Sequence, residues 1–375
     1  MNFAEFFAGI GLVRLGLERA GWSCVFANDI DGKKFEMYRA QFPHDPEGHF
    51  VCDDIRNVRA DLLPDVQLAT ASFPCTDLSL AGARAGLAGE HSSALWPFLE
   101  VLEKLKTMRP QLVMLENVPG FLTSHGGGDF RSALLALNRI GYVVDAFVID
   151  AANFVPQSRQ RLFVVGRHAP GLAIAEHRNL FGFVESEHRP SALIDFMFKN
   201  MDVVWQVREL PALPKKRSTL AEVLEPLPDS AIEWWSDART EYLLGQMSDR
   251  HRAQAELMTK GASEAVGTVF RRVRNGRSMA ELRVDGVAGC LRTPKGGSGR
   301  QILFVAGRGR ARARLLTPRE CARLMGADDY PITVPLNQAL YGFGDAVCVP
   351  VITWIAESYL NPVLADLPSR LTKTI

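Results

Sequence analysis

The chain has 375 residues, of which 47% are hydrophobic and 23% are charged. These values are typical of a soluble globular protein, and the length indicates about two domains. No apolar run approaches about eighteen residues, and no basic stretch leads into an apolar segment at the N-terminus. We therefore predict neither a membrane span nor a signal peptide, and we expect a cytoplasmic protein.

The cysteines show neither CxxC pairs nor the spacing of a disulfide framework. They are Cys24, Cys52, Cys75, Cys290, Cys321 and Cys348. Such cysteines are typical of reduced thiols in a cytosolic protein, and no metal site is predicted. We interpret all of them except Cys75 and Cys290 as small packing residues.

The net charge of +1 conceals an uneven distribution. Residues 271–323 hold thirteen arginines and one lysine against three acidic residues, a net charge of +11 for this segment. The rest of the chain is therefore acidic. This polarity predicts one basic face, for which a polyanion is the natural partner.

Strands and helices alternate over the first 167 residues. Strands are predicted at 3–7, 24–27, 67–71, 111–115, 142–149 and 162–165, with a short one ending at Cys52. Helices are predicted up to residue 20, up to residue 38, at 94–108 and at 132–140. This alternation predicts an α/β fold with a doubly wound, mostly parallel sheet.

The pattern breaks after Gly166. Residues 168–217 are rich in proline, and from 219 to 334 helical signals are weak, with short strands predicted at 267–273 and 302–305. Residues 347–360 predict an amphipathic helix that returns to the first domain. We therefore predict a large domain of residues 1–218, completed by 335–375, and a smaller domain of residues 219–334.

Polar or glycine-rich segments follow three of the predicted strands. Phe7–Gly11 forms a glycine-rich turn, which lets a ligand approach the backbone at a helix N-terminus. Asp29 ends the second strand, where a carboxylate can accept hydrogen bonds from ribose hydroxyls. Asp54 and Ile55 follow the third strand and could meet an adenine ring. Together these strand ends predict a site for an adenosine-containing cofactor.

A thiol and a carboxylate follow the next two strands. Cys75 closes Ser72-Phe73-Pro74-Cys75, and Glu116 opens Glu116-Asn117-Val118. The carboxyl ends of parallel strands share one edge of a sheet, so we expect these two groups to lie side by side. A thiol that can act as a nucleophile, beside a carboxylate that can bind the ring, would allow a thiolate to add to C6 of cytosine.

The chain resembles the bacterial cytosine-C5 DNA methyltransferase family, whose motifs occur here in the family's order. The matching segments are Phe7–Gly11, Asn28–Asp31, Cys52–Ile55, Ser72–Cys75, Glu116–Val118, Gln157–Arg161, Pro318–Gly326 and Gly342–Val347. They extend over most of the chain, and the ordered set is far more specific than any one motif.

The chain departs from the family pattern at four places. Glu5 stands where the family has Asp, and Thr76-Asp77 replace a Gln-polar pair after the cysteine. Asp345 replaces an Asn, and Cys290-Leu291 replaces the usual Thr-Leu. None of these changes removes the predicted nucleophile, the acid or the ring-binding arginine.

The resemblance implies a class I S-adenosylmethionine methyltransferase fold, Rossmann-like, with a target-recognition domain. It implies cofactor contacts from Phe7, Ala8, Gly9, Ile10, Gly11, Asp29, Ile30, Asp54, Ile55, Pro74, Asp345 and Ala346. Cys75 would be the nucleophile, Glu116 would hold N3 and the exocyclic amine, and Arg161 would bind O2 and Glu116. Arg159 would supply positive charge for the thiolate, and Asn117 would orient its loop.

Duplex DNA is the partner that the resemblance implies, with the target cytosine flipped out of the helix. The segment 78–92 is interpreted as a lid, and recognition is predicted in 271–283 and 293–300. The DNA contacts expected are Arg84, Arg272, Arg274, Arg277, Arg283, Thr293, Lys295 and Arg300. Phosphate contacts are expected from Arg308, Arg310, Arg312 and Arg314.

Two other functions remain open at this point. One is RNA methylation, because the tRNA-acting branch of the family shares the same core; the long basic second domain argues against it. The other is a catalytically inactive DNA-binding relative, which the retention of Cys75, Glu116 and Arg161 disfavours. We expect a monomer that works beside a restriction enzyme or other phage-defence proteins.

Overall fold

The computed structural model describes residues 1–74, 94–170, 184–215, 218–274, 276–293 and 299–367. Cys75, Arg84, Lys295 and the predicted lid at 78–92 lie outside the described residues.

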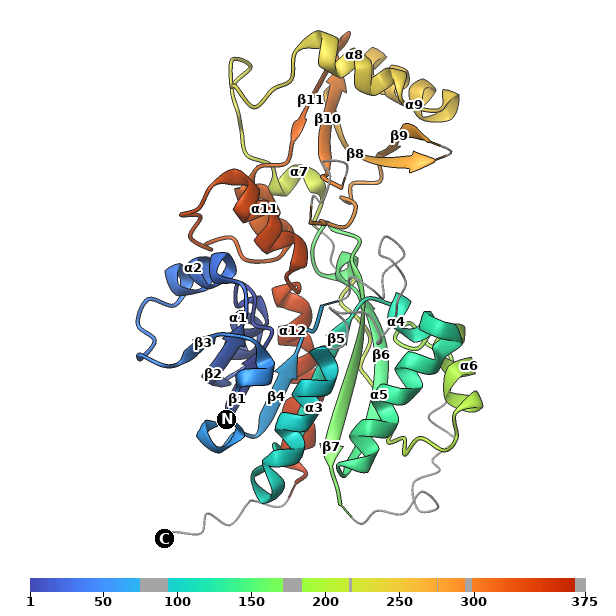
Figure 1. The fold of residues 1–375 in the computed structure, drawn as a ribbon. Helices are drawn as coiled ribbons and strands as arrows, with labels where there is room; N and C mark the ends of the chain where they lie inside the picture. Colours follow the sequence, from blue (N-terminus) through green and yellow to red (C-terminus); the bar gives the residue numbers. More distant parts are fainter. Residues whose placement is uncertain (75–93, 171–183, 216–217, 275, 294–298, 368–375) are drawn as a thin grey trace.

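The larger sheet has seven strands in the order β3-β2-β1-β4-β5-β7-β6 (Figure 1). They are β1 (Asn2–Phe6), β2 (Ser23–Asp29), β3 (Phe50–Cys52), β4 (Leu68–Ala71), β5 (Leu112–Asn117), β6 (Tyr142–Asp150) and β7 (Gln160–His168). The first five strands in this order run parallel, whereas β7 runs antiparallel to both β5 and β6. The predicted doubly wound, mostly parallel sheet is therefore confirmed.

Helices cover both faces of this sheet because strand side chains alternate between them. On β1, Phe3 packs in the core beneath α1 (Leu12–Arg19) and α12 (Val349–Ile355). Its neighbour Ala4 packs in the opposite core. That second core holds α3 (Leu95–Lys104), α4 (Gly120–Thr123), α5 (Gly128–Arg139) and α6 (Ser191–Lys199).

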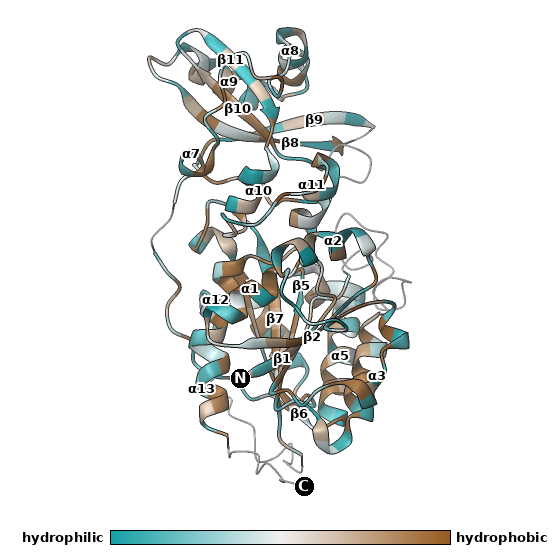
Figure 2. Ribbon diagram, turned by 90° about the vertical axis from the view of Figure 1, so that its left-hand side faces the viewer, coloured by the Kyte–Doolittle hydropathy of each residue, from teal (hydrophilic) through white to brown (hydrophobic). Residues whose placement is uncertain are grey.

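The C-terminal helical stretch is apolar but belongs to the core. It comprises α11 (Leu336–Asp345), α12, a π-helical turn (Ala356–Leu360) and α13 (Asn361–Ala365). By length and composition Leu336–Ala365 could cross a membrane, and Figure 2 shows hydrophobic residues along it in brown. Most of its apolar window is nevertheless buried inside the protein. A Cβ on Gly16 of α1 would lie 2.5 Å from Ile352 Cβ, so α12 packs directly on α1.

The smaller sheet is antiparallel, in the order β11-β10-β8-β9. Its strands are β8 (Ala265–Arg274), β9 (Arg277–Arg283), β10 (Ile302–Gly307) and β11 (Arg310–Leu315). Two helices that the sequence did not predict, α8 (Asp237–Gly245) and α9 (Asp249–Lys260), pack on it through Leu243 and Met258 (Figure 1).

Further helices lie between the two sheets and around the larger one. They are α2 (Gly32–Gln41), α7 (Leu220–Val223) and α10 (Pro318–Leu324). Cys321 and Leu324 of α10 share a core with Phe3 and Leu12 of the larger domain. This part of residues 219–334 thus packs with the larger domain, and the boundaries at 218 and 334 stay predictions.

A buried ion pair fastens β11 to α10. Arg314 donates to both carboxylate oxygens of Glu320 at 2.7 and 2.6 Å, and the two side chains are 1% and 0% exposed. Thr317 caps α10 in a capping box with the same Glu320. The expectation that Arg314 faces DNA phosphates is therefore wrong, because its guanidinium is buried and paired with Glu320.

Candidate active site

The strand register brings the predicted motifs to one edge of the larger sheet. Phe6 at the end of β1 pairs with Asn28 of β2 and with Ala71 of β4. Ala71 in turn pairs with Leu115 of β5. The residues that follow these pairs, which include Asp29 of β2 and Glu116 of β5, therefore lie at the same end of the sheet, on strands that β1 and β4 separate.

The turn after β1 has a conformation that favours glycine. Gly9 and Gly11 have φ values of 57° and 78°, and a Cβ on Gly11 would lie 2.5 Å from the ring of Phe42. Phe7 itself has φ of 55°, which is strained for an aromatic residue. Such strain is typical of a functional turn that the surrounding structure holds in place.

Asp29 is 8% exposed and lies against this turn. Its carboxylate accepts hydrogen bonds from the backbone amides of Gly9 (2.8 Å) and Asp31 (2.9 Å). Burial raises its pKa, against the opposing charge of Lys34 and these two amides. The neighbouring Ile30 is 67% exposed, so a large apolar side chain stands in the open beside a buried carboxylate.

Other predicted cofactor residues have local structural roles. Asp54 caps the turn Ile55–Asn57 and forms an ion pair with Arg56 at 2.5 Å. The side chains of Ala8, Ile10 and Ile55 are buried, so only their backbone could meet a ligand directly. Pro74 is exposed at the end of the described segment.

The motif Gly342–Val347 at the end of α11 packs against the turn Phe7–Gly11 that follows β1. A Cβ on Gly342 would lie 3.0 Å from Ile10 Cγ2, so α11 packs closely on the turn. At its end Asp345 forms an ion pair with Lys34 of α2 at 2.8 Å, and Ala346 follows, half-buried. The Lys34 side chain would lie 4.0 Å from a Cβ on Gly9. Lys34 is therefore a residue at this edge that the sequence analysis did not single out.

Glu116 and Arg161 form the contact that the family resemblance implied. Arg161 Nε lies 2.9 Å from Glu116 Oε1, and the two side chains are 14% and 8% exposed. Burial raises the pKa of Glu116, although Arg161, Arg159 and a hydrogen bond from Ser72 oppose the rise. Asn117 donates to the backbone oxygen of Phe73 at 3.1 Å and so ties this motif to the segment that leads to Cys75.

Arg159 is 2% exposed and contacts two segments far away in the sequence. Its guanidinium donates to the thiol of Cys290 at 3.2 Å and to the backbone oxygens of Leu291, Gly344 and Ala346. Whether it also acts on Cys75 stays a prediction, since that residue is outside the described part of the chain.

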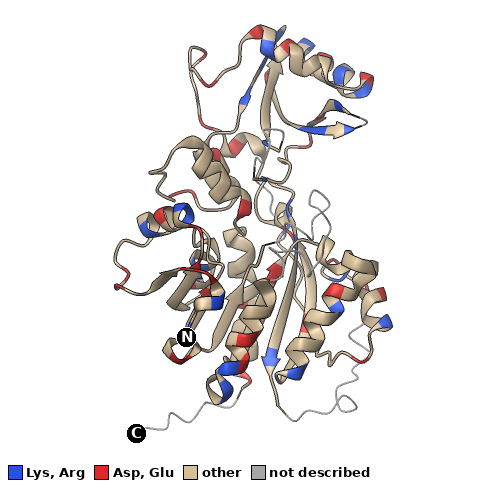
Figure 3. Cartoon of the chain, in the orientation of Figure 1, with Lys and Arg blue, Asp and Glu red and all other residues tan. Residues whose placement is uncertain are grey.

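Arginines and acidic residues both occur on the small sheet and the segments beside it (Figure 3), and several of these arginines form ion pairs. Arg272 and Arg274 form ion pairs with Glu281, and Arg283 pairs with Asp285. Arg310 and Arg312 both pair with Asp229, and Arg312 also pairs with Glu264. Acidic side chains therefore offset part of the positive charge that the sequence assigned to one open face.

Arg277 and Thr293 differ from these arginines. Arg277 is exposed and pairs with Arg274 at the tip of the β8–β9 hairpin. Thr293 is half-buried at the end of a described segment. Between Leu291 and Thr293, Arg292 is exposed and its guanidinium lies 5.1 Å from the ring of Phe270. The sequence analysis missed Arg292, although it directly follows the altered Cys290-Leu291.

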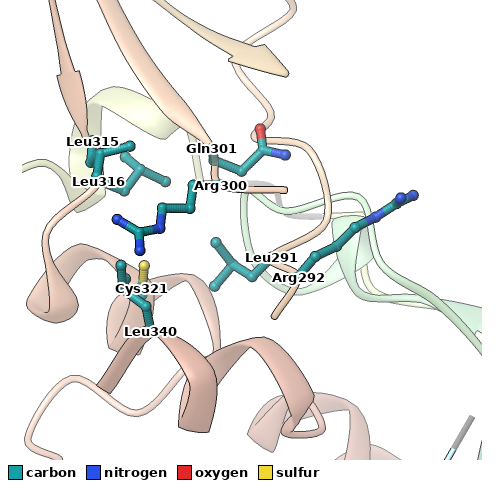
Figure 4. Close-up of a pocket in the computed structure, with 8 residues that line it drawn as sticks. All are labelled: Leu291, Arg292, Arg300, Gln301, Leu315, Leu316, Cys321 and Leu340. Carbon is teal, nitrogen blue, oxygen red and sulfur yellow. The ribbon is translucent and has the colours of Figure 1, made fainter. Parts of the chain in front are cut away.

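Arg300 lines a hollow where the small sheet meets α10 and α11 (Figure 4). The hollow is also lined by Leu315, Cys321 and Leu340, and by Arg292, whose guanidinium end points away from the other labelled residues in Figure 4. Arg300 donates to Asn337 of α11 at 2.7 Å, so reading a DNA base would require it to leave this contact. None of the strand-edge residues above lines the hollow, which is therefore distinct from the candidate active site.

The fold and this edge together define a Rossmann-like methyltransferase with an added antiparallel domain. A family model described as C-5 cytosine-specific DNA methylase matches residues 1–361, and the chain belongs to this family. Membership makes it an enzyme of the DNA cytosine-5 methyltransferase class, and the family and fold imply S-adenosylmethionine as methyl donor.

Individual relatives agree with this assignment. The chain is 30% identical over 358 residues to the Type II methyltransferase M.NlaX of Neisseria lactamica, which covers 94% of each protein. It is 38% identical to M.BsuFI of Bacillus subtilis over 175 residues, which is 46% of this chain and 41% of that one. The methyltransferase EhMeth of Entamoeba histolytica has the same fold, with a TM-score of 0.63, 15% identity and coverage of 97% and 98%.

Proposed function

We propose that this chain transfers a methyl group to C5 of a flipped cytosine in a specific duplex DNA site, through a covalent bond between Cys75 and C6. It would act in the cytoplasm as the modification arm of a restriction or phage-defence system. The observation that carries the proposal is the buried Glu116–Arg161 pair, tied through Asn117 to the segment that ends at Cys75.

The residues at the strand edge fit S-adenosylmethionine. Gly9 leaves space at the strained turn, where a Cβ would meet nothing closer than 4.0 Å. Asp29 retains acceptor capacity for ribose hydroxyls beyond its two amide bonds, and the exposed Ile30 offers a face for the adenine. The cofactor would supply an electrophilic methyl group at this edge.

Glu116 and Arg161 would stabilise charge on the cytosine ring. Cytosine C5 is too electron-poor to attack a methyl group until a thiolate has added to C6. That addition places negative charge on N3, where Glu116 could donate a proton because burial raises its pKa. Arg161 would hold both Glu116 and O2 of the ring. Loss of the C5 proton and release of the Cys75 thiol would complete the reaction.

Bisulfite sequencing of DNA from cells that express the protein tests this proposal. Protected cytosines in one sequence context are expected, and they should disappear in cells that express Cys75→Ala. Purified protein should also methylate duplex DNA in preference to tRNA. Transfer to tRNA alone would favour the RNA function, and transfer to neither would favour an inactive relative.

Glu116→Gln should lower kcat by about 100- to 1000-fold, since one buried group that stabilises the developing charge is lost. The affinity for S-adenosylhomocysteine should not change, because Glu116 is assigned to the cytosine. The matched control is Glu103→Gln, an exposed residue at the end of α3. A loss of kcat below about tenfold would show that Glu116 only braces Arg161.

Asp29→Asn should weaken S-adenosylhomocysteine binding by about 1–3 kcal/mol and leave DNA affinity nearly unchanged. The reason is that the amide keeps the size of the side chain but loses the charge that ribose hydroxyls would meet. Calorimetry with each ligand measures the effect, and Asp61→Asn, at an exposed ion pair with Arg59, is the control. Equal losses for both ligands would mean that Asp29 serves only the Gly9 and Asp31 amides.

Arg277→Ala should cost about 1–3 kcal/mol on the cognate site and little on random duplex, as expected if it reads guanine in the major groove. Arg310→Ala is the control, because Arg310 is exposed but paired with Asp229. Competition binding measures the ratio of the two affinities. The same ratio for both variants would remove Arg277 from the recognition residues.

A further inference from the structure

Arg159 carries a buried charge and forms no ion pair with a carboxylate in the described part of the chain, although the charges of Glu116 and Asp345 act on it without direct contact. Three of its four hydrogen-bond partners are backbone oxygens, and the fourth is the thiol of Cys290 at 3.2 Å. Its Nε is buried and has no hydrogen-bond partner among the described residues. An arginine cannot lose its proton under ordinary conditions, so an anion beside it would offset a large desolvation cost.

Cys290 is the only one of these partners that can become an anion. Its sulfur lies 3.2 Å from the Arg159 guanidinium and 3.3 Å from the backbone oxygen of Leu291, which can accept a hydrogen bond from the protonated thiol. Arg161 of β7 and the neighbouring Arg292 add further positive charge that acts on the thiol. Burial would raise the pKa of the thiol, but these charges outweigh burial and lower it. Burial instead raises the pKa of the other described cysteines, to about 12 for Cys348.

The same contacts lead to the cofactor edge. Arg159 binds the carbonyl oxygens on both sides of Asp345, and Asp345 pairs with Lys34 beside the first turn. Gly344 has no space for a side chain, because a Cβ there would lie 2.8 Å from the backbone of Arg292. The segment that contains Cys290 thus packs directly on the turn that ends α11.

We propose that Cys290 is present as a thiolate, the counter-ion of Arg159, and that this ion pair holds the turn Gly344–Ala346 in position for the cofactor. Cys290 is then a positioning residue that acts through Arg159 and does not touch the reacting atoms. The thiolate is inferred from the contact between Cys290 and the buried Arg159, and only the link to the cofactor rests on the proposed function.

The ultraviolet absorbance of the thiolate tests the charge without any ligand. Titrations of Cys75→Ala and of Cys75→Ala/Cys290→Ser are subtracted to isolate Cys290. The difference in absorbance between the two proteins should reach half of its full amplitude at a pH below about 8.5, the ordinary pKa of a thiol. A midpoint at or above that value overturns the proposal. Cys348→Ser in the same background is the control, and its difference should be absent up to about pH 9.

Calorimetry with S-adenosylhomocysteine, in the absence of DNA, tests the link to the cofactor turn. Cys290→Ser should weaken binding by about tenfold, since a charge-assisted bond to Arg159 becomes a neutral one. Cys290→Asp restores an anion beside Arg159, so its affinity for S-adenosylhomocysteine should be within about threefold of the wild-type affinity. Equal losses in both variants, or none in either, would overturn the positioning role. Failure of the wild type to bind would instead contradict the proposed cofactor, while the absorbance result would stand.

Discussion

Cys75→Ala is expected to abolish methyl transfer and to leave S-adenosylhomocysteine affinity nearly unchanged. The thiol takes part only in the addition to C6, whereas the cofactor would be held by the turn after β1, by Asp29 and by the end of α11. Single-turnover transfer of a labelled methyl group to duplex DNA, with calorimetry on the same preparation, measures both quantities.

A duplex with 5-fluorocytosine at the target provides the control for this prediction. The wild type should form an adduct that survives denaturation, because fluorine at C5 cannot leave as a proton does. Peptide mapping should locate the adduct on Cys75, and the alanine variant should form none. An adduct in the alanine variant, or one on Cys290, would transfer the role of nucleophile to another residue.

The positions of the functional residues at the strand ends could be predicted, because buried strands are recognisable as apolar runs and parallel strands end at the same edge of a sheet. A strand buried on both faces reads as a continuous apolar run, and the residue after such a run leaves the sheet at its edge. Asp29 and Glu116 therefore follow from local sequence, and the sheet register confirms their common edge. The Glu116–Arg161 contact came from the family resemblance, since the sequence predicted a strand at 162–165 but not that it runs antiparallel to β5.

Charge partners could not be predicted in the same way. Arg314 alternates with Arg310 and Arg312 along β11, which favoured an open basic stripe, yet Glu320 lies within reach only after β11 and α10 pack together. Asp229 and Glu264 reach the same strand from other segments. The helices α8 and α9 were missed for a related reason: each buries few residues, so their apolar spacing is weak.

Glu5 shows how a small departure from the family pattern can have a large energetic consequence. It stands on β1 where the family has Asp, and it is 1% exposed. One carboxyl oxygen accepts from the Arg14 amide at 3.3 Å, and the other has no hydrogen-bond partner among the described residues. Burial raises its pKa from the ordinary 4.5 to about 8, although the charge of Arg14 opposes the rise. With this pKa we expect Glu5 to keep its proton in the folded protein at neutral pH.

Glu5→Gln is expected to stabilise the protein at alkaline pH and to have little effect at pH 5. Between about 4.5 and 8 the unfolded chain has lost the Glu5 proton while the folded chain retains it, so unfolding releases a proton. The free energy of unfolding therefore falls as pH rises, by about 1.4 kcal/mol for each unit and by roughly 5 kcal/mol over the window. Glutamine has nearly the same size, keeps an acceptor for the Arg14 amide and does not titrate.

Urea denaturation of both proteins at pH 5, 6.5 and 8 measures this difference. The difference in the free energy of unfolding between the variant and the wild type should increase steadily with pH. The contributions of other titrating groups cancel in this difference because both proteins contain them. Glu103→Gln, at an exposed position on α3, should give a gap that is independent of pH. If the Glu5→Gln gap were equally constant, Glu5 would be ionised in the folded protein, and a counter-charge or solvent near β1 would have to compensate its burial.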